Sequence, residues 1–565
     1  MKMKNLAIVV AAFLSSLQAY AAPQSNPSEK SKAPKLILML VIDQFRADYL
    51  LRFESRFLPA RGASGVKRKW GGYRTLMNGG AYYPYAQYDI LQSMTCPGHA
   101  TVLTGAYPYQ AGIPSNEWFN TATQKYTYCA EDPASSIVGA KVDDPHLGTS
   151  PKNLLASTVG DELKNAGYPS KVVTLSLKDR AAIMMGGQRP DLAVWLEPKS
   201  FQWVSSKFYL PGGELPAWVR GLNEELKAAK GNALAWRPDG PGTGFSAKDS
   251  KALIDAKNAG KYGGTAFPHE TKMGSKESLA FPFGLEITEK AAEAAIDWMK
   301  LGQGESTDLF AVSFSTHDYL GHVFGPNSRE MEEMTIAEDQ ILAKFLNHLE
   351  RKIPGGLANV TIVLTGDHGI TPNPDWLADH QVKSGRIDET LLAKQINDRL
   401  QEKFGKLKDA QSFVSYCHDF NIFLNHAGIT EKKLVMAEVE AEAKAVVMQT
   451  EGIAHVLTSS EYAAKKLPPG MFDRQSVHTY YPGRSGDLVV IPKPYFIPAE
   501  SDTVIHVTGY AYDRTVPLIF YGYGIKPGKY ANRADVIDIA PTLSYLAKVL
   551  PPNMSEGRVL SEILK

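Results

Sequence analysis

The sequence has little cysteine and, beyond its first residues, no long apolar segment. Its 565 residues include 3 cysteines, Cys96, Cys129 and Cys417, which are too few for a disulfide-stabilised fold. One bridge, for example Cys96–Cys129, would be possible in an oxidising compartment, and the sequence does not establish it. After the N-terminal segment no stretch approaches the roughly 18 uninterrupted apolar residues of a membrane-spanning helix. We therefore expect no stable membrane association of the mature protein.

A surplus of charge of either sign is also absent. Lysine and arginine total 61 and aspartate and glutamate total 60, for a formal net charge of +1. A protein that mainly binds nucleic acid usually carries a marked basic surplus, so we expect no nucleic-acid partner. The chain is 44% hydrophobic, which at this length allows a large core.

The first residues have the pattern of a secretory signal peptide. Residues 1–4 are basic, residues 6–14 form a short apolar run, and Ala-Tyr-Ala at 19–21 fits the small-x-small cleavage rule. The alternative is an N-terminal anchor, but no cysteine near residue 21 could carry a lipid. We predict a signal peptide over 1–21, a flexible polar leader over 22–34, and a periplasmic or secreted protein.

Apolar runs of strand length alternate with helical patterns through residues 35–565. The run at 35–42 is apolar at nearly every position, as expected for a strand buried on both faces. Further runs lie at 171–176, 308–315, 359–365, 487–491 and 516–521, and helical patterns lie at 153–165, 286–300, 331–352 and 535–549. This alternation predicts an α/β fold with a mostly parallel, doubly wound sheet.

Two long segments interrupt the alternation. Residues 201–283 are rich in glycine, proline, tryptophan and lysine and have no clear period. Residues 372–481 contain helical patterns at 389–404 and 431–448. We expect both segments to be insertions that form a cap over the active edge of the sheet.

Acidic and imidazole side chains follow several predicted strands. Because parallel strands end at the same edge of a sheet, we expect these side chains to gather there. The candidates are Asp43 after the first run, Asp318 and His322 after 308–315, Asp367 and His368 after 359–365, and His506 before the last run. Alone, each residue is more simply a cap, a polar helix face or a loop residue. Their joint occurrence favours a metal centre.

The composition of this set indicates which metal chemistry it suits. Three aspartates and three histidines are enough for two metals with three protein ligands each, and mixed nitrogen and oxygen ligation suits catalytic zinc. Calcium or manganese is the alternative. Two neighbouring metals can stabilise both the attacking and the leaving oxygen of a displacement at phosphorus.

A loop that leads into a short predicted helix, 92–101, offers a nucleophile. Pro97 suits the first helical turn, so Thr95 would lie at the helix N-terminus, where backbone N–H groups favour a phosphoryl group. Thr95 could instead be only a capping residue. Ser93 and Cys96 are rival nucleophiles, and His99 is expected to pack or hydrogen-bond locally rather than to act as a base.

In combination these motifs resemble the alkaline phosphatase superfamily, and most closely the bacterial periplasmic phosphate-irrepressible alkaline phosphatases, which use a threonine nucleophile. The resemblance runs from the strand before Asp43 to a segment at 535–542 that is similar to a C-terminal helix of the superfamily. It rests on Val-Ile-Asp at 41–43, Met-Thr-Cys-Pro-Gly-His at 94–99, Asp318 with His322, Thr-Gly-Asp-His-Gly at 365–369, and His506.

The resemblance implies a role for each candidate residue. Asp318, His322 and His506 would hold one zinc ion. Asp43, Asp367 and His368 would hold the other, together with the Thr95 oxygen. The implied mechanism is attack by Thr95, a phosphothreonine intermediate and its hydrolysis.

Three further residues match those that separate monoesterases from diesterases in the superfamily. Asn116, Lys178 and Arg180 would bind the terminal oxygens of a phosphate monoester, a dianion that needs more donors than a diester. The resemblance thus implies a phosphate monoesterase of broad scope on small molecules. The sequence leaves the oligomeric state open, and a monomer is our working assumption.

Rival functions make distinguishable predictions. A sulfatase would need the pattern Cys/Ser-x-Pro-x-Arg, which Cys96-Pro97 does not supply. A phosphodiesterase or nucleotide pyrophosphatase would share the metal centre but have no use for Lys178 and Arg180. A cofactor-independent mutase belongs in the cytosol, against the signal peptide. A secreted metal-binding protein without activity would be expected to lack a ligand or the nucleophile.

Overall fold

The computed structural model describes residues 33–60, 71–121, 123–141, 148–240, 260–467, 472–501 and 503–565. The predicted signal peptide over 1–21 and nearly all of the leader over 22–34 lie outside these residues. The chain divides into two units at Ala33, and every element below belongs to the second unit, Pro34–Lys565. None of the helices in the described parts combines the length and the apolar composition that crossing a bilayer requires.

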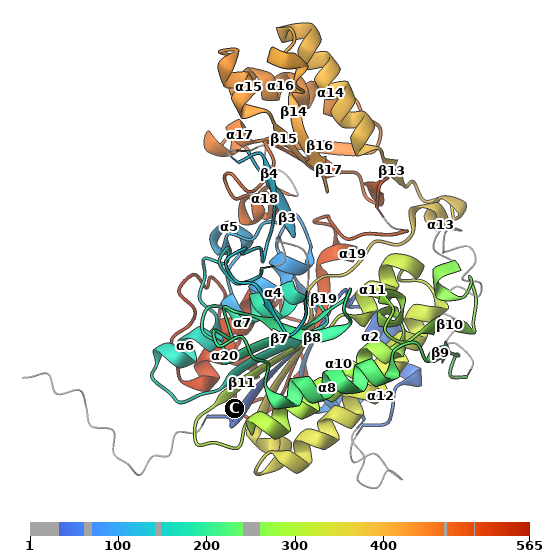
Figure 1. Cartoon of the computed structure of the whole chain (residues 1–565), viewed down its shortest axis with the longest axis vertical. Helices are drawn as coiled ribbons and strands as arrows, with labels where there is room; N and C mark the ends of the chain where they lie inside the picture. Colours follow the sequence, from blue (N-terminus) through green and yellow to red (C-terminus); the bar gives the residue numbers. More distant parts are fainter. Residues whose placement is uncertain are drawn as a thin grey trace, which may run out of the picture. The chain divides into compact units, whose positions relative to one another are not determined.

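The central feature is a large sheet, which has 10 strands in the described residues (Figure 1). In their order across the sheet these are β20 (Gly528–Lys529), β2 (Ala81–Gln87), β19 (Thr515–Gly522), β12 (Val360–Gly366), β1 (Leu36–Ile42), β11 (Asp308–Phe314), β6 (Val172–Ser176), β7 (Leu192–Glu197), β8 (Gln202–Ser206) and β5 (Ile137–Val138).

The middle of this sheet is parallel and its flanks are antiparallel. β1 pairs in parallel with both β11 and β12, and β6 continues the parallel order to β7. β19 and β2 on one side, and β8 and β5 on the other, pair antiparallel with their inner neighbours. The predicted α/β fold with a mostly parallel sheet is confirmed.

The sequence of β1 explains why helices cover both faces. All seven side chains of Leu36–Ile42 are buried, and they alternate between two apolar cores. Leu36 and Leu38 belong to the first core, and Ile37 and Met39 to the second. The first core is covered by α3 (Tyr73–Gly79), α8 (Ala217–Ala229), α10 (Pro282–Met299) and α12 (Arg329–Lys352), the second by α4 (Thr95–Thr104), α6 (Val159–Asn165) and α20 (Ile539–Ala547).

The described parts of the first insertion, 201–240 and 260–283, pack with the main sheet rather than forming a separate cap, which corrects one expectation. Their first strand, β8, is part of the main sheet. The apolar side of α8 packs on the first core through Trp218 and Leu222, and Trp236 belongs to the same core. The sequence did not predict this packing, because the strands are short and the polar residues obscure the helical period of α8.

The second insertion forms a lobe with its own core, which includes Phe420 and Ile422 (Figure 1). Its four-stranded sheet runs β14 (Val414–His418), β15 (Asn421–Leu424), β17 (Leu488–Pro492), β16 (Ile453–Thr458), and its helices include α14 (Glu389–Phe404), α15 (His426–Glu431), α16 (Met436–Val447), α17 (Ser459–Ala463) and α18 (Asp473–Thr479). The predicted strand at 487–491 is therefore β17 of the lobe and not part of the main sheet, and the lobe extends past the expected boundary at 481.

Short elements complete the described chain. They are α2 (Tyr49–Arg52), α5 (Pro108–Ala111), the hairpin of β3 (Glu117–Asn120) and β4 (Lys125–Tyr128), α7 (Asp179–Gly186), the hairpin of β9 (Ala233–Trp236) and β10 (His269–Lys272), α11 (Thr316–Phe324), α13 (Pro374–Asp379), the pair β13 (Gly385–Ile387) and β18 (Phe496–Pro498), and α19 (Ala511–Arg514).

Candidate active site

Strand register brings the predicted ligands to one edge of the main sheet. The last residue of β1, Ile42, lies opposite Phe314 of β11 and Gly366 of β12. The residues that follow β1 and β12 are Asp43 and Asp367, so the two carboxylates leave the sheet side by side. The chain after β11 turns at once into α11, which carries the other predicted aspartate.

The ligands on the strand ends, Asp43, Asp367 and His368, form the strand-borne half of the site. The three side chains are fully buried, and one ligand atom from each lies within 4.8 Å of the others. His368 Nε2 is 3.2 Å from Asp367 Oδ2 and 3.4 Å from Asp43 Oδ1. This half has the composition expected for one metal.

The other predicted ligands, Asp318, His322 and His506, form the helix-borne half. Asp318 and His322 are one turn apart on α11, and His322 Nε2 is 3.2 Å from Asp318 Oδ1. His506, from the loop before α19, places its Nε2 3.3 Å from the same oxygen. The two halves adjoin, because the rings of His368 and His506 stack at 3.5 Å and both lie within 4.8 Å of Asp318.

All three imidazoles are held in the orientation that metal ligation needs. The Nδ1 atoms of His322, His368 and His506 each lie 2.9 Å from a backbone carbonyl oxygen, those of Val504, Gly369 and Ser93. A donor bond from Nδ1 leaves Nε2 as the lone-pair nitrogen, and Nε2 is the atom that faces the carboxylates.

Polar atoms at the centre are poorly satisfied by hydrogen bonds. Within the described residues, neither oxygen of Asp43, nor Asp367 Oδ2, nor His368 Nε2 takes part in a hydrogen bond of good geometry. Their contacts are ion pairs, such as Asp43 Oδ2 with Lys178 Nζ at 2.7 Å and Asp367 Oδ2 with His99 Nδ1 at 3.1 Å. Buried polar groups are normally satisfied, so these converging atoms are suited to hold a cation. Nitrogen and carboxylate oxygen atoms together fit zinc.

The charges at the site are strongly coupled. Burial, together with the charges of Asp318 and Asp367, raises the pKa of Asp43 to about 6. Burial lowers the pKa of His506 to about 3, so that imidazole is neutral, as a ligand must be. Against the effect of burial, Asp367 raises the pKa of His368 to about 9 and Asp318 raises the pKa of His322 above its ordinary value, so a metal would have to displace the proton of His368. A bound cation would relieve the crowding of the three carboxylates.

The start of α4 lies against the strand-borne half. Thr95 is the first residue of the helix and is almost fully buried, and in the described structure Met94 occupies the N-cap position without a side-chain cap. The Thr95 hydroxyl is therefore not used to cap the helix. A Cβ on Gly98 would lie 2.4 Å from the Asp367 carbonyl oxygen, so only glycine allows this approach. The first turn of α4, which begins with Thr95, thus packs against the backbone of Asp367.

Cys96 forms a disulfide bond with Cys129. The bridge that the sequence left open is therefore present, and it removes Cys96 from the rival nucleophiles. Ser93 remains in the loop, where its carbonyl oxygen accepts from His506. His99 Nδ1 lies 2.9 Å from the Thr95 carbonyl oxygen and 3.1 Å from Asp367 Oδ2, and its Nε2 lies 2.9 Å from Ser313 Oγ. His99 therefore contacts a predicted metal ligand as well as its local surroundings.

The three predicted substrate-binding residues surround this centre. Lys178 follows β6 and touches both halves, with Nζ 2.7 Å from Asp43 Oδ2 and also in contact with Asp318 Oδ2. Arg180 lies two residues further, in the first turn of α7. Asn116 Oδ1 accepts a 2.8 Å hydrogen bond from the Cys96 N–H. Because Oδ1 faces Cys96, the NH₂ group of the same side chain points away from Cys96.

Gln44 is a site residue that sequence reasoning missed. It is fully buried with φ 66°, a conformation that is costly for a residue with a side chain. Its backbone N–H donates to Asp367 Oδ1 and its Nε2 donates to Asp318 Oδ1, both at 2.9 Å. Gln44 therefore joins the two halves. The sequence signal was only its position after Asp43.

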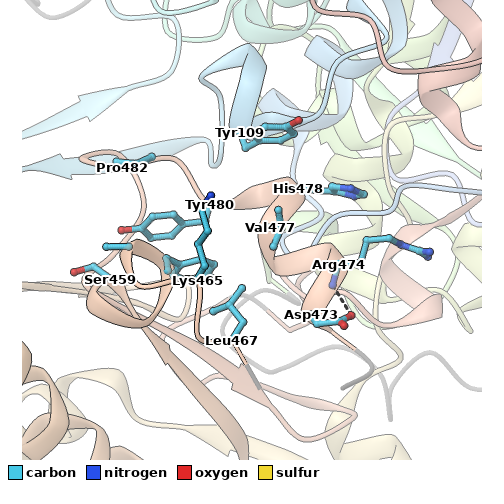
Figure 2. A pocket seen from close by; sticks show the side chains of 12 residues that line it. Tyr109, Ser459, Lys465, Leu467, Asp473, Arg474, Val477, His478, Tyr480 and Pro482 are labelled. Atoms are coloured by element: carbon cyan, nitrogen blue, oxygen red, sulfur yellow. Dashed lines mark hydrogen bonds between the residues drawn. The ribbon is translucent and has the colours of Figure 1, made fainter. Parts of the chain in front are cut away.

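One cavity in the described structure is separate from this centre. It has a volume of about 840 Å³ and is bordered by α18 and the segment after α17, with Tyr109 opposite (Figure 2). Tyr480, Val477 and Lys465 are among its lining residues, which include none of the candidate site residues. Its apolar walls do not suit the chemistry of the ligand cluster.

Comparison with known proteins identifies the family. The chain belongs to the family described as Type I phosphodiesterase / nucleotide pyrophosphatase, which matches residues 37–504. It is 32% identical over 551 residues to a protein of Myroides odoratus named calcium-transporting ATPase, covering 95% of this chain and 96% of that protein. It is also 32% identical over 578 residues to alkaline phosphatase PhoV of Synechococcus elongatus, covering 100% of both.

A solved structure agrees with these relatives. The crystal structure of alkaline phosphatase PafA superposes with a TM-score of 0.84 at 29% identity, covering 95% of this chain and 100% of that one. The resemblance to the alkaline phosphatase superfamily, inferred above from motifs, is confirmed.

Proposed function

We propose that this protein is a secreted, zinc-dependent phosphate monoesterase, an alkaline phosphatase that acts through Thr95. The observation that carries the proposal is the convergence of five buried ligands beside the first turn of the helix that begins with Thr95. The sixth ligand, His322, joins them through its Nε2, which lies 3.2 Å from Asp318 Oδ1. Two of the relatives described above bear the name alkaline phosphatase.

Each half of the site would hold one zinc ion. The strand-borne half offers Asp43, Asp367 and His368, and the helix-borne half offers the remaining ligands. When bound, the metals would neutralise the charge that develops on the attacking and leaving oxygens. The protein holds the ligands ready through Gln44 and through the carbonyl oxygens on the imidazole Nδ1 atoms.

Thr95 is assigned the role of nucleophile. Its oxygen would attack phosphorus as the bond to the leaving oxygen breaks, which gives a phosphothreonine and an alcohol. Attack of water on the phosphothreonine then releases inorganic phosphate and restores the hydroxyl. The N-terminus of α4 supports both steps, because its free N–H groups and dipole favour the negative phosphoryl group.

Asn116, Lys178 and Arg180 would make the site selective for monoesters. A monoester dianion presents terminal oxygens that can accept from an amide, an ammonium and a guanidinium, whereas a diester replaces one oxygen by an ester group. Burial alone would lower the pKa of Lys178, but Asp318 and Asp43 raise it above its ordinary value, so the ammonium is charged at alkaline pH.

A variant of PafA supports this set of residues. One solved structure of that phosphatase carries substitutions of a threonine, an asparagine, a lysine and an arginine, spaced 21, 62 and 2 residues apart. Thr95, Asn116, Lys178 and Arg180 occur here in the same order and with the same spacing.

The second candidate function is phosphodiester or nucleotide pyrophosphate hydrolysis, favoured by the description of the matching family. The test is kcat/KM of the zinc-loaded protein for 4-nitrophenyl phosphate and for bis(4-nitrophenyl) phosphate at alkaline pH. We expect a monoester preference of several orders of magnitude. A diester preference would keep the metal centre and Thr95 but reject the assigned role of Asn116, Lys178 and Arg180.

A further inference from the structure

The disulfide bond lies directly beside the nucleophile. Cys96 follows Thr95 in the first turn of α4, and Cys129 follows β4, the second strand of the hairpin that begins after Asn116. Both cysteines are fully buried. The bond therefore ties this hairpin covalently to the start of α4.

Asn116 is held between the two bonded cysteines. The Cys129 N–H donates to the Asn116 backbone carbonyl oxygen at 2.9 Å, and the Cys96 N–H donates to Asn116 Oδ1 at 2.8 Å. One cysteine thus fixes the main chain of Asn116 and the other fixes its side-chain amide. With Oδ1 facing Cys96, rotation of the amide would cost that hydrogen bond, so the NH₂ group has one favoured direction.

The hairpin is also held by noncovalent contacts. Trp118 is buried in an apolar core, and Phe119 stacks on Tyr416, while the other side chains of β3 and β4 are half-buried or exposed. Tyr128, next to Cys129, donates to Asp179 Oδ1 at 2.6 Å, beside Arg180. Asn153 Nδ2 donates to the Cys129 carbonyl oxygen at 3.1 Å. These contacts hold the β4 end, whereas the disulfide alone links it covalently to the helix that carries Thr95.

We propose that the Cys96–Cys129 disulfide is a positioning device for Asn116, which it holds so that the side-chain NH₂ group meets a terminal oxygen of the phosphoryl group at Thr95. The inference rests on the proposed function, because it assumes that Asn116 binds substrate. Loss of the bridge would leave the Asn116 amide free to rotate or withdraw with the hairpin, while the carboxylate and imidazole ligands, which lie on other elements, stay in place.

A double-mutant cycle tests this role. The background carries Cys417→Ala, which removes the free thiol and so prevents mispairing. We compare Cys96→Ala/Cys129→Ala, Asn116→Ala and the combination of all three, using kcat/KM for 4-nitrophenyl phosphate and the inhibition constant of inorganic phosphate. Removal of a hydrogen bond to a charged oxygen should make Asn116→Ala about 10- to 100-fold slower.

The expected result is strong non-additivity. Loss of the bridge should lower kcat/KM about 10-fold when Asn116 is present and less than about 2-fold when Asn116 is alanine, with the phosphate inhibition constant following the same pattern. An equal loss in both backgrounds would overturn the inference and leave the proposed function standing. If Asn116→Ala has no effect, both the positioning role and the assignment of Asn116 fail.

Two controls separate positioning from general weakening. Leu222→Ala, in the core under α8, should lower the melting temperature without changing the phosphate inhibition constant. Cys96→Ser/Cys129→Ser offers a second bridge-free variant should the alanine pair fail to fold. Bound zinc is measured in each variant, and a loss of zinc on removal of the bridge would contradict the role assigned to the disulfide.

Discussion

The two halves of the metal centre differ in how the fold holds them. The strand-borne half stands on the ends of two paired strands of the main sheet, and its side chains are fully buried. The helix-borne half depends on one turn of α11 and on the loop that carries His506, and the His322 side chain is 23% exposed. Sheet register fixes the positions of the residues in the strand-borne half. The ligands of the helix-borne half depend on several separate packing contacts.

If each half holds one metal, as proposed, this difference suggests that the two metals exchange at different rates. A site whose ligands are rigid before binding loses less entropy on binding, and exposure of a ligand admits water and competing chelators. We therefore expect tighter binding and slower exchange at the strand-borne half.

Thr95→Ala should have the largest effect on turnover. It should not change the difference in metal binding between the two halves. We expect kcat to fall by about 10⁴-fold or more, as is common when a nucleophile is removed, with both zinc ions retained. Steady-state kinetics and metal analysis of the same sample measure the two quantities. Substantial residual activity would move the nucleophile to Ser93.

Removal of one ligand from each half compares the halves directly. Asp367→Ala should abolish tight zinc binding at the strand-borne half, while His322→Ala should weaken binding at the helix-borne half and leave the other intact. Competition with a chelator of known affinity measures both steps. If His322→Ala released the metal from both halves, the separate support proposed for each would be wrong.

Gln44→Met should distinguish the two hydrogen bonds of Gln44. The substitution removes the Nε2 donor to Asp318 but keeps the backbone N–H that donates to Asp367. Loss of an outer partner commonly costs about 10- to 100-fold in metal affinity, so we expect this loss at the helix-borne half only. The strand-borne half in the same titration is the internal control, and equal weakening of both halves would contradict the prediction.

Arg180→Ala should affect substrate selection and neither metal. A guanidinium bound to the terminal oxygens of a dianion contributes about 1.5 to 3 kcal/mol, so we expect about a 10- to 100-fold lower kcat/KM for monoesters. Diester turnover should change by less than about 3-fold, because a diester offers one terminal oxygen fewer. Equal losses on both substrate classes would refute the assigned selectivity.

Glu338→Gln should have the smallest effect on turnover, because Glu338 only supports the helix-borne half. It lies 3.1 Å from His317, the neighbour of Asp318, and burial raises its pKa to about 8. Because the folded state holds this proton more tightly than the unfolded state, the stabilisation is present at low pH and is lost as the pH rises toward 8. Glu338→Gln should remove on the order of 3 kcal/mol of this pH dependence, measured by urea unfolding of the metal-free protein at pH 5 and pH 9.

Residues on strand ends were predictable because their signal is local. Asp43 and Asp367 each end a continuous apolar run, so sequence alone placed them at the edge of a parallel sheet. Gln44 was not predictable, since its role depends on φ 66° and on the absence of a side chain at Gly321, where a Cβ would lie 1.7 Å from Gln44 Oε1. Such a fit between distant segments leaves no local pattern.

The insertions show the same limit at the level of the fold. β8 is short and partly polar, and only its pairing with β7 assigns it to the main sheet. The run at 487–491 looks like a main-sheet strand, but its partners β15 and β16 lie in the lobe. Strand pairing is long-range, so periodicity identified these strands without identifying their sheet.

The most direct test of the two-metal centre is a zinc titration of the metal-free protein, with bound zinc and kcat for 4-nitrophenyl phosphate measured at each step. We predict that the first equivalent fills the strand-borne half with little activity, and that turnover appears as the second equivalent binds. Full activity after about one equivalent would contradict a centre in which both halves are needed for catalysis.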